Sequence, residues 1–391
     1  MKRIAPITFT RAEYSSFVPV LKALRADPGF ETQLLVSGTH LSPQFGNTVE
    51  QIEADGFPIA DRIPMEIHSD TPEAVSRAVG LVMGGFAQSF AWLKPDLLLL
   101  VGDRLELIAP VTAALAARIP VAHISGGDLT EGAIDNQVRY AVTQMSHLHF
   151  VAMQEHADRL LHLGEEPWRV HVVGEPALDL LKDMRLLSRP ELAESLGVEL
   201  KPPVLVVTYH PTTLGTTSAG EEVESLIQAL EQIQGTLIVT MPNADVEWQT
   251  VLARLREFVS RRSSARLYPS LGALRYYSLL SHADLMVGNS SSGIWESPSF
   301  KIPVVNIGDR QRGRRRSHNV IDVPCAKEAI LGGIQRAVSR GFKESLANLA
   351  NPYGDGHAAG RIVAALSKTD FGTKLSMKRL TDGCNQLPLK Q

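Results

Sequence analysis

LLLLVGDR, residues 97–104, is the stretch that decides the fold. Five apolar residues follow one another without a polar break, as in a parallel strand that helices cover on both faces. The strand then leads directly into Asp103 and Arg104, and α/β folds keep their site residues at the carboxyl ends of such strands. An N-capping Asp103 beside a solvated Arg104 is the simpler alternative. The stretch therefore predicts a parallel sheet and a candidate position for a site.

Short apolar runs alternate with helix-like segments on both sides of this stretch. In the first half, strands are predicted at 4–10, 32–37, 96–101, 120–124, 147–152 and 170–173, and helices at 17–24, 49–54, 72–90, 106–117 and 138–145. In the second half, strands are predicted at 204–209, 236–241, 266–268, 284–287, 303–307 and 320–323, and helices at 221–232, 246–258, 273–281, 293–298 and 326–338. This alternation predicts an α/β protein with a doubly wound, Rossmann-like sheet in each half.

The 391 residues exceed the usual size of one domain, which is about 100–200 residues. We predict an N-terminal lobe over 1–185, a linker over 186–202 and a C-terminal lobe over 203–365. Residues 366–391 are predicted to form a polar tail, frayed from Met377 onward. Two such lobes place a ligand cleft between them, at the carboxyl ends of the strands.

Composition and charge exclude several classes of protein. With 39 Lys+Arg against 42 Asp+Glu, the net charge of −3 lacks the cationic surplus of a nucleic-acid coat or a binder of anionic membranes. Two cysteines argue against a disulfide framework and a Cys-based zinc site. The chain shows neither a signal peptide nor an apolar run of membrane-spanning length, so a cytoplasmic location is predicted.

Polar side chains also follow the other predicted strands of the first half. Arg11 and Ser15 come after the first strand, where a helix N-terminus would help to hold a phosphate; a capping Ser15 and a solvated Arg11 are the alternative. Asp128, Glu131 and Asp135 follow the strand at 120–124, next to the strand that ends before Asp103. Clustered carboxylates can tune one another's proton affinity and act as acid and base, although a solvated acidic loop explains them too.

Three features of the second half complete the candidate site. His210 ends the strand at 204–209, as a proton carrier or a donor to a leaving phosphate, or simply as a structural histidine. The segment 288–293, of sequence GNSSSG, opens a helix where amides and hydroxyls can bind an anion, and Glu296 one turn later can accept from ribose hydroxyls. It lacks a Walker ending, so ATP hydrolysis is not indicated. The five arginines of 310–316 are either a solvated loop or an anion-binding segment.

Taken together and in order, these motifs resemble UDP-N-acetylglucosamine 2-epimerases. The matching motifs are Arg11-Ala12-Glu13-Tyr14, Gly102-Asp103-Arg104, Gly126-Gly127-Asp128, Glu131-Gly132-Ala133-Ile134-Asp135, His210-Pro211, Gly288-Asn289-Ser290-Ser291 and Asn351-Pro352-Tyr353-Gly354-Asp355-Gly356. The resemblance covers roughly residues 1–365. It implies the two-lobed GT-B fold with a C-terminal helix that crosses back to the first lobe. It also implies removal of the C2 proton and cleavage of the sugar–UDP bond, with no metal and no cofactor.

His210-Pro211-Thr212-Thr213 and the 131–135 loop resemble the hydrolysing branch of this family rather than its non-hydrolysing branch, which carries His-Arg-Arg-Glu-Asn there. That branch releases UDP and the free 2-epimer, typically for sialic or legionaminic acid synthesis. The expected substrate is UDP-GlcNAc, UDP-diacetylbacillosamine or a GDP-linked relative, and the expected assembly is a homodimer or homotetramer. A GT-B glycosyltransferase and a non-catalytic nucleotide-sugar-binding protein remain alternatives.

The predicted site residues fall into two sets. The catalytic set is Asp103, Asp128, Asp135, Asp179 and His210. The substrate and nucleotide contacts are Arg11, Ser15, Arg104, Asn243, Asn289, Ser290, Ser291, Ser292, Glu296 and Arg310. Two positions depart from the family: Phe9 replaces a common glycine, and Ser125 stands where some members have a catalytic glutamate, so Asp128 is expected to take part of that load.

Overall fold

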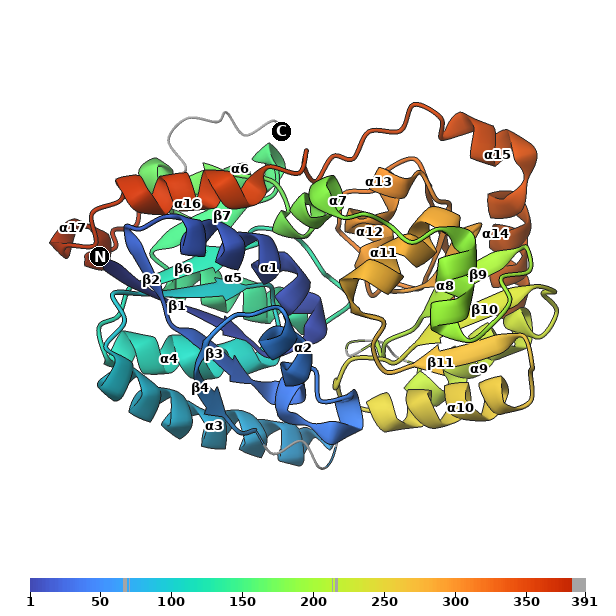
Figure 1. The fold of residues 1–391 in the computed structure, drawn as a ribbon, viewed down its shortest axis with the longest axis horizontal. Coiled ribbons are helices and arrows are strands. Elements are labelled where there is room, and N and C mark those ends of the chain that lie inside the picture. Colours follow the sequence, from blue (N-terminus) through green and yellow to red (C-terminus); the bar gives the residue numbers. More distant parts are fainter. Residues whose placement is uncertain (66–68, 70, 213, 215–216, 382–391) are drawn as a thin grey trace, which may run out of the picture.

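A computed structural model describes residues 1–65, 69, 71–212, 214 and 217–381, and it contains two parallel sheets (Figure 1). In the N-terminal half, eight strands lie in the order β4-β3-β1-β5-β6-β7-β8, with β2 paired to β1. Their bounds are β1 Lys2–Thr8, β2 Phe30–Thr32, β3 Leu34–Ser37, β4 Ile59–Ile63, β5 Leu97–Val101, β6 Val121–Ile124, β7 Leu148–Val151 and β8 Val170–Val172. All of the described pairings in this sheet are parallel.

The C-terminal sheet has six described strands in the order β11-β10-β9-β12-β13-β14, again all parallel. Their bounds are β9 Val204–Thr208, β10 Thr236–Thr240, β11 Ala265–Tyr268, β12 Leu285–Gly288, β13 Val304–Ile307 and β14 Val320–Val323. Two doubly wound parallel sheets confirm the predicted fold class.

Helices cover both faces of each sheet (Figure 1). Those of the first half are α1 Arg11–Ala26, α2 Val49–Ala54, α3 Pro72–Leu93, α4 Ile108–Ala116, α5 Asp135–Met145, α6 Gln154–His162, α7 Leu180–Asp183 and α8 Arg189–Leu196. Those of the second half are α9 Ala219–Leu230, α10 Trp248–Ser260, α11 Gly272–His282, α12 Ser292–Trp295, α13 Ser297–Phe300, α14 Lys327–Val338 and α15 Arg340–Ser345. The last two helices, α16 Ala358–Lys368 and α17 Thr373–Ser376, pack on the N-terminal lobe, α16 against α1.

Strand β5 shows why the apolar run forms a central strand. Leu97 and Leu99 lie in one core cluster with side chains of α1 and α16, whereas Leu98 and Leu100 lie in a second cluster with side chains of α3 and α4. All four leucines are fully buried. A strand without polar alternation is therefore satisfied by helices on both of its faces.

Each sheet changes direction at one point, and these points position the candidate site. In the first sheet the chain moves outward from β1 to β3 and β4, then returns to β5 on the other side of β1. In the second sheet the same reversal separates β9 from β12. Ligands of doubly wound folds bind outside the carboxyl ends of the strands at such switch points. Arg11, Asp103, His210 and Ser290 follow β1, β5, β9 and β12 respectively.

The end of the chain differs from the sequence prediction. Leu366 and Leu375 are fully buried, and Arg169 donates to the backbone carbonyls of Leu375 at 2.9 Å and of Met377 at 3.1 Å. Lys378 forms an ion pair with Glu165 at 2.5 Å. Single apolar residues and carbonyl contacts therefore anchor residues 366–381, the described part of the predicted polar tail, to the N-terminal lobe. Residues 382–391, which that prediction also covered, lie outside the described residues.

Candidate active site

The loop between β1 and α1 is shaped by a capping box. The side chain of Glu13 accepts hydrogen bonds from the amides of Phe9 at 2.8 Å and Thr10 at 3.1 Å. This capping sets Arg11 at the first position of α1, where its guanidinium donates to the carbonyl of Met241 at 3.0 Å, at the end of β10 in the other lobe. Burial lowers the pKa of Arg11 to about 10. Within the described residues Arg11 has no acidic partner in an ion pair, so it is a candidate to bind an anionic ligand.

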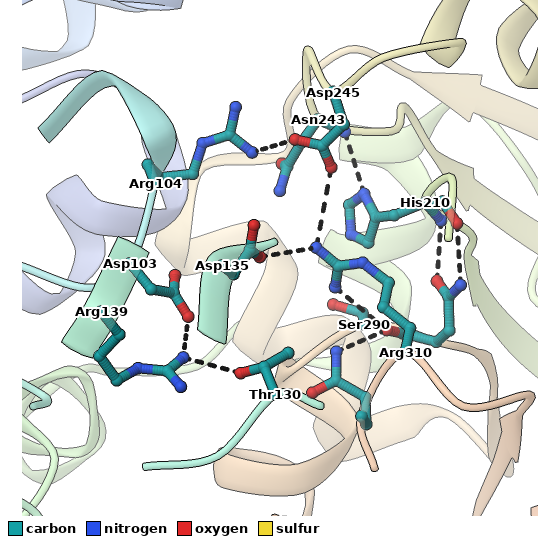
Figure 2. Close-up of polar contacts among 12 residues, drawn as sticks. Asp103, Arg104, Thr130, Asp135, Arg139, His210, Asn243, Asp245, Ser290 and Arg310 are labelled. Carbon is teal, nitrogen blue, oxygen red and sulfur yellow. Dashed lines mark hydrogen bonds and ion pairs between the residues drawn. The ribbon is translucent and has the colours of Figure 1, made fainter. Parts of the chain in front are cut away.

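Asp103 and Asp128 are both paired with arginine, and Figure 2 shows the pairing of Asp103 with Arg139. Arg139 donates to Asp103, and Arg314 lies 3.4 Å from Asp103 and 3.1 Å from Asp128. Burial raises the pKa of Asp128, but the charge of Arg314 and a contact with His156 at 3.3 Å outweigh it and leave that pKa below its usual value. Asp128 is therefore an ionised, charge-compensated group, and a low pKa makes a weak general base.

Asp135 lies in a different electrostatic setting, at the start of α5. Its Oδ2 atom is 3.4 Å from Nη2 of Arg310, a residue of the C-terminal lobe (Figure 2). Burial raises the pKa of Asp135, the charge of Arg310 opposes this rise, and the neighbouring Asp245 adds to it, with a net increase. A carboxyl with a raised pKa is suited to taking a proton near neutral pH.

Asp245 is a site residue that sequence reasoning missed. It accepts a hydrogen bond from Arg104, which follows β5 in the other lobe, and its second oxygen lies 3.7 Å from Arg310. Burial raises the pKa of Asp245, but the charges of Arg104 and Arg310 lower it by a larger amount. The net pKa lies below its usual value, so Asp245 stays ionised. The sequence feature that could have identified Asp245 is its position in the loop after β10, two residues beyond the predicted contact Asn243.

His210, which follows β9, is held by two asparagines. Its backbone amide and carbonyl each bond the side chain of Asn289 at 2.8 Å, and its Nδ1 accepts from the amide of Asn243 at 3.0 Å (Figure 2). A ring nitrogen that accepts leaves the proton on Nε2, so the neutral imidazole is a hydrogen-bond donor. Burial, then the charge of Arg310, holds the pKa of His210 well below its usual value. The side chain of Asn289 is fully buried and fixes the histidine segment.

The predicted anion-binding helix is shorter than expected. Instead of one helix over 293–298, the chain forms two single turns, α12 and α13, so little helix dipole is available there. The polar side chains are nevertheless ordered: Ser292 bonds the hydroxyl of Tyr276 at 2.6 Å, and Glu296 accepts from Tyr277 at 2.6 Å. Ser290 accepts from the amide of Ser292 at 3.4 Å.

Three of the predicted site residues contact groups away from the Asp135–Arg310 pair or lie within or next to a single helix. Both carboxylate oxygens of Asp179 accept from the first amides of α16, those of Ala358 at 2.9 Å and Ala359 at 2.7 Å, so Asp179 caps that helix. The hydroxyl of Ser15 donates to the carbonyl of Arg11 at 3.1 Å within α1. Ser291 precedes α12 as its N-cap residue, without a side-chain capping bond.

The arginine-rich segment 310–316 is divided between the lobes and solvent. Arg310 and Arg314 are buried against acids of the N-terminal lobe, whereas Arg312 is 68% exposed and contacts only Glu131 among the described acids. Gly132 lies so close to this segment that a Cβ atom there would be 2.1 Å from the carbonyl oxygen of Asp309. The segment therefore joins the two lobes at the site instead of forming a solvated loop.

Two parallel α/β lobes whose switch points bring acids of one lobe against arginines of the other define a class of two-lobed proteins. Sequence comparison names the family. The model of the UDP-N-acetylglucosamine 2-epimerase family matches residues 22–367, so the chain belongs to that family. It is 38% identical over 323 residues, 82% of this chain and 84% of the relative, to a protein of Campylobacter jejuni named GDP/UDP-N,N'-diacetylbacillosamine 2-epimerase (hydrolyzing). It is 34% identical to the UDP-N,N'-diacetylbacillosamine 2-epimerase (hydrolyzing) of Legionella pneumophila, covering 97% of this chain and 99% of that protein.

Solved structures share the fold. The UDP-GlcNAc 2-epimerase of Neisseria meningitidis bound to UDP-GlcNAc superposes with a TM-score of 0.78 at 19% identity, covering 94% of this chain and 100% of that one. The Staphylococcus aureus MnaA–UDP structure gives a TM-score of 0.77 at 19% identity, covering 94% and 96%. These neighbours confirm the GT-B architecture. Among the described residues, no helix combines the length and apolar character needed to cross a membrane.

Proposed function

We propose that this chain is a hydrolysing nucleotide-sugar 2-epimerase. It removes the proton at C2 of a bound N-acetylamino sugar, releases the nucleoside diphosphate and adds water to give the free 2-epimer. The observation that carries this proposal is the contact between Asp135 and Arg310, 3.4 Å apart across the lobes. It places a carboxyl of raised pKa beside a cation that is suited to a diphosphate, in a chain 38% identical to a protein named as a hydrolysing 2-epimerase.

The reaction needs a base and help for the departing group, because a C2 proton of a hexosamine is weakly acidic. Asp135 is the base in this proposal. His210, as a neutral Nε2–H donor, and the arginines Arg11 and Arg310 stabilise the charge that develops on the leaving diphosphate. General acid–base help of this kind contributes about 10²–10⁴-fold. The ion pairs of Asp103 and Asp128 with Arg314 hold the lobes in the arrangement that this chemistry requires.

For the substrate we propose a UDP- or GDP-linked N-acetylamino sugar, with nucleotide-linked diacetylbacillosamine ahead of UDP-GlcNAc. The names of the Campylobacter and Legionella relatives support this order, at 38% and 34% identity. We also propose a cytoplasmic homodimer or homotetramer, which cell fractionation and analytical ultracentrifugation test.

The test uses the purified chain and a panel of three substrates: UDP-GlcNAc, UDP-diacetylbacillosamine and its GDP-linked counterpart. Chromatography follows the nucleoside diphosphate and NMR follows the sugar, without any acceptor. We expect nucleoside diphosphate together with free 2-epimer, which carries deuterium at C2 when the reaction runs in D₂O. Binding without release indicates a non-catalytic binder, release only with an acceptor indicates a glycosyltransferase, and an unchanged configuration at C2 indicates simple hydrolysis.

A further inference from the structure

A buried carboxyl outside the set described so far lies at the same edge of the N-terminal sheet. Glu175 follows β8 and is 2% exposed. Its Oε1 atom accepts from the hydroxyl of Ser16 on α1 at 2.9 Å, and its Oε2 atom accepts from the hydroxyl of Ser125, directly after β6, at 2.8 Å. Three segments far apart in the sequence therefore converge on one carboxyl group.

The charges around Glu175 distinguish it from the acids paired with Arg314. Glu296 is close enough to repel it, and the phenols of Tyr277 and Tyr353 face it from the other lobe and from the 351–357 segment. None of the ion pairs among the described residues includes Glu175. Burial is the largest influence, the two serine hydroxyls oppose it only in part, and the pKa of Glu175 rises to about 7. The group is therefore able to gain and lose a proton near neutral pH.

The backbone of Ser125 adds a second, independent observation. Its φ is +65°, in the left-handed region that residues other than glycine rarely occupy. The neighbouring strand β7 holds this conformation, since the amide of Ser125 donates to the carbonyl of Phe150 at 2.9 Å. Strained backbone of this kind concentrates at functional sites. It places the hydroxyl of Ser125 against Glu175, at the carboxyl edge where the ligand of a doubly wound sheet binds.

We propose that Glu175 supplies the proton that C2 of the sugar receives, and that the hydroxyl of Ser125 passes it on. This inference rests on the proposed function. Inversion at C2 requires a proton to leave on one face and another to arrive on the opposite face, so two groups are needed. Asp135 removes the first from its position on α5, and Glu175 delivers the second from the ends of β8 and β6.

The step balances as follows. The carboxylate of Asp135 takes the C2 proton, the C–H electron pair becomes the C1–C2 double bond, and the diphosphate leaves with the C1–O electron pair. Asp135 then returns its proton to solvent. In the second half, the electrons of the double bond take the proton of the Ser125 hydroxyl, the acid proton of Glu175 replaces it, and water bonds to C1 and gives its proton to Asp135. Asp135 then releases this proton to solvent, and solvent reprotonates Glu175, so both carboxyl groups return to their starting states.

The test compares Glu175→Gln, which keeps the size of the side chain but cannot carry a proton, with Ser125→Ala, which removes the relay and keeps the carboxyl. In both variants we expect formation of free 2-epimer to fall by about 10²–10⁴-fold, while UDP affinity stays within a few-fold of the parent. Nucleoside diphosphate release continues, and the unsaturated sugar, one water lighter than the product, accumulates and is seen in the NMR spectrum.

The pH profile is a second readout. In the parent, kcat falls as the pH rises through about 7, because the acid form of Glu175 donates the proton. This descending limb of the pH profile is absent in Glu175→Gln.

Glu165→Gln is the matched control, a buried carboxyl of the same lobe. It pairs with His149 and Lys378, and Lys378 also contacts the end of α5, at the opposite edge of the sheet. This variant is expected to keep the parent's product ratio and pH limb. Parent-like epimer formation in either test variant, or loss of activity without the unsaturated sugar and with the pH limb intact, overturns the proposal. Failure of the proposed function is distinct: the parent itself then releases no nucleoside diphosphate from any of the three substrates.

Discussion

Replacing Arg314 by methionine tests whether the arginine segment joins the lobes through buried charge. Arg314 lies 3.4 Å from Asp103, 3.1 Å from Asp128 and 3.1 Å from the hydroxyl of Thr130, and its guanidinium stacks 4.5 Å from the ring centroid of Trp295. Together with Arg139, two arginines balance two aspartates in this buried cluster. Arg314→Met leaves one buried negative charge uncompensated, and breaking a buried pair in this way costs about 3–5 kcal/mol.

Arg312→Met is the matched control in the same segment. Arg312 is 68% exposed and makes a single ion pair at 3.1 Å with Glu131, and surface pairs of this kind contribute about 0–1 kcal/mol. Urea unfolding of the full chain, followed by circular dichroism and by tryptophan fluorescence because two lobes need not unfold together, measures both variants. If the two variants lose equal stability, or if Arg314→Met loses less than about 1 kcal/mol, the segment does not join the lobes as described.

The same variant has a defined pH dependence. The pKa of Asp128 is held below its usual value in the folded parent, so this group contributes stability that is present above its unfolded pKa and is lost as the pH falls through its folded pKa. The stability difference between parent and Arg314→Met should therefore be largest at neutral pH and narrow below about pH 4. A difference that does not narrow as the pH falls below about 4 contradicts the electrostatic explanation.

Further outcomes are expected at the proposed site. Asp135→Asn and His210→Ala should each lower kcat by about 10²–10⁴-fold while calorimetry still shows UDP binding, because base and donor act in the transition state. Arg11→Ala and Glu296→Ala should mainly raise KM; for Arg11 the loss of one charge-assisted contact corresponds to about 10- to 100-fold, and unchanged UDP affinity in both variants contradicts their assignment to the nucleotide. EDTA should leave turnover unchanged, since arginines are proposed to supply the positive charge at the diphosphate; activity lost in EDTA and restored by Mg²⁺ contradicts this.

The parts of the fold that could be predicted from the sequence are those in which one hydrophobic pattern dominates. The strands predicted at 96–101 and 303–307 match β5 and β13 to within one residue, because continuous apolar sequence is typical of strands buried on both faces; Asn306 is the polar exception in β13. Strand β4 was missed because its sequence, IADRI, alternates too weakly and is only half buried. The anchoring of residues 366–381 could not be predicted, because it depends on Leu366, Leu375 and carbonyl contacts from Arg169, none of which forms a periodic pattern.

The sequence predicts where the site lies better than it predicts which arginine pairs with which acid. The switch points place the residues that follow β1, β5, β9 and β12 at facing edges, and each predicted cluster lies after one of these strands or a neighbour. Local sequence does not encode which arginine meets which acid. Arg314 meets Asp128 through tertiary structure alone, and Asp245 became recognisable only once its contacts with Arg104 and Arg310 were seen.

These pairings divide the acids of the candidate site by chemistry, although the sequence presents them as equivalent residues. Asp128 and Asp245 are buried beside arginines that lower their pKa values, so they remain charged and hold the lobes together. Asp135 and Glu175 are equally buried, but Asp135 shares its cation with Asp245 and Glu175 has no ion-pair partner among the described residues, so their pKa values rise. A pKa of about 7 lets Glu175 exchange a proton near neutral pH, and the raised pKa of Asp135 makes its carboxylate a better proton acceptor than those of Asp128 and Asp245. The balance of burial, cationic partners and neighbouring carboxylates therefore determines which acids support the fold and which are available to act on the sugar.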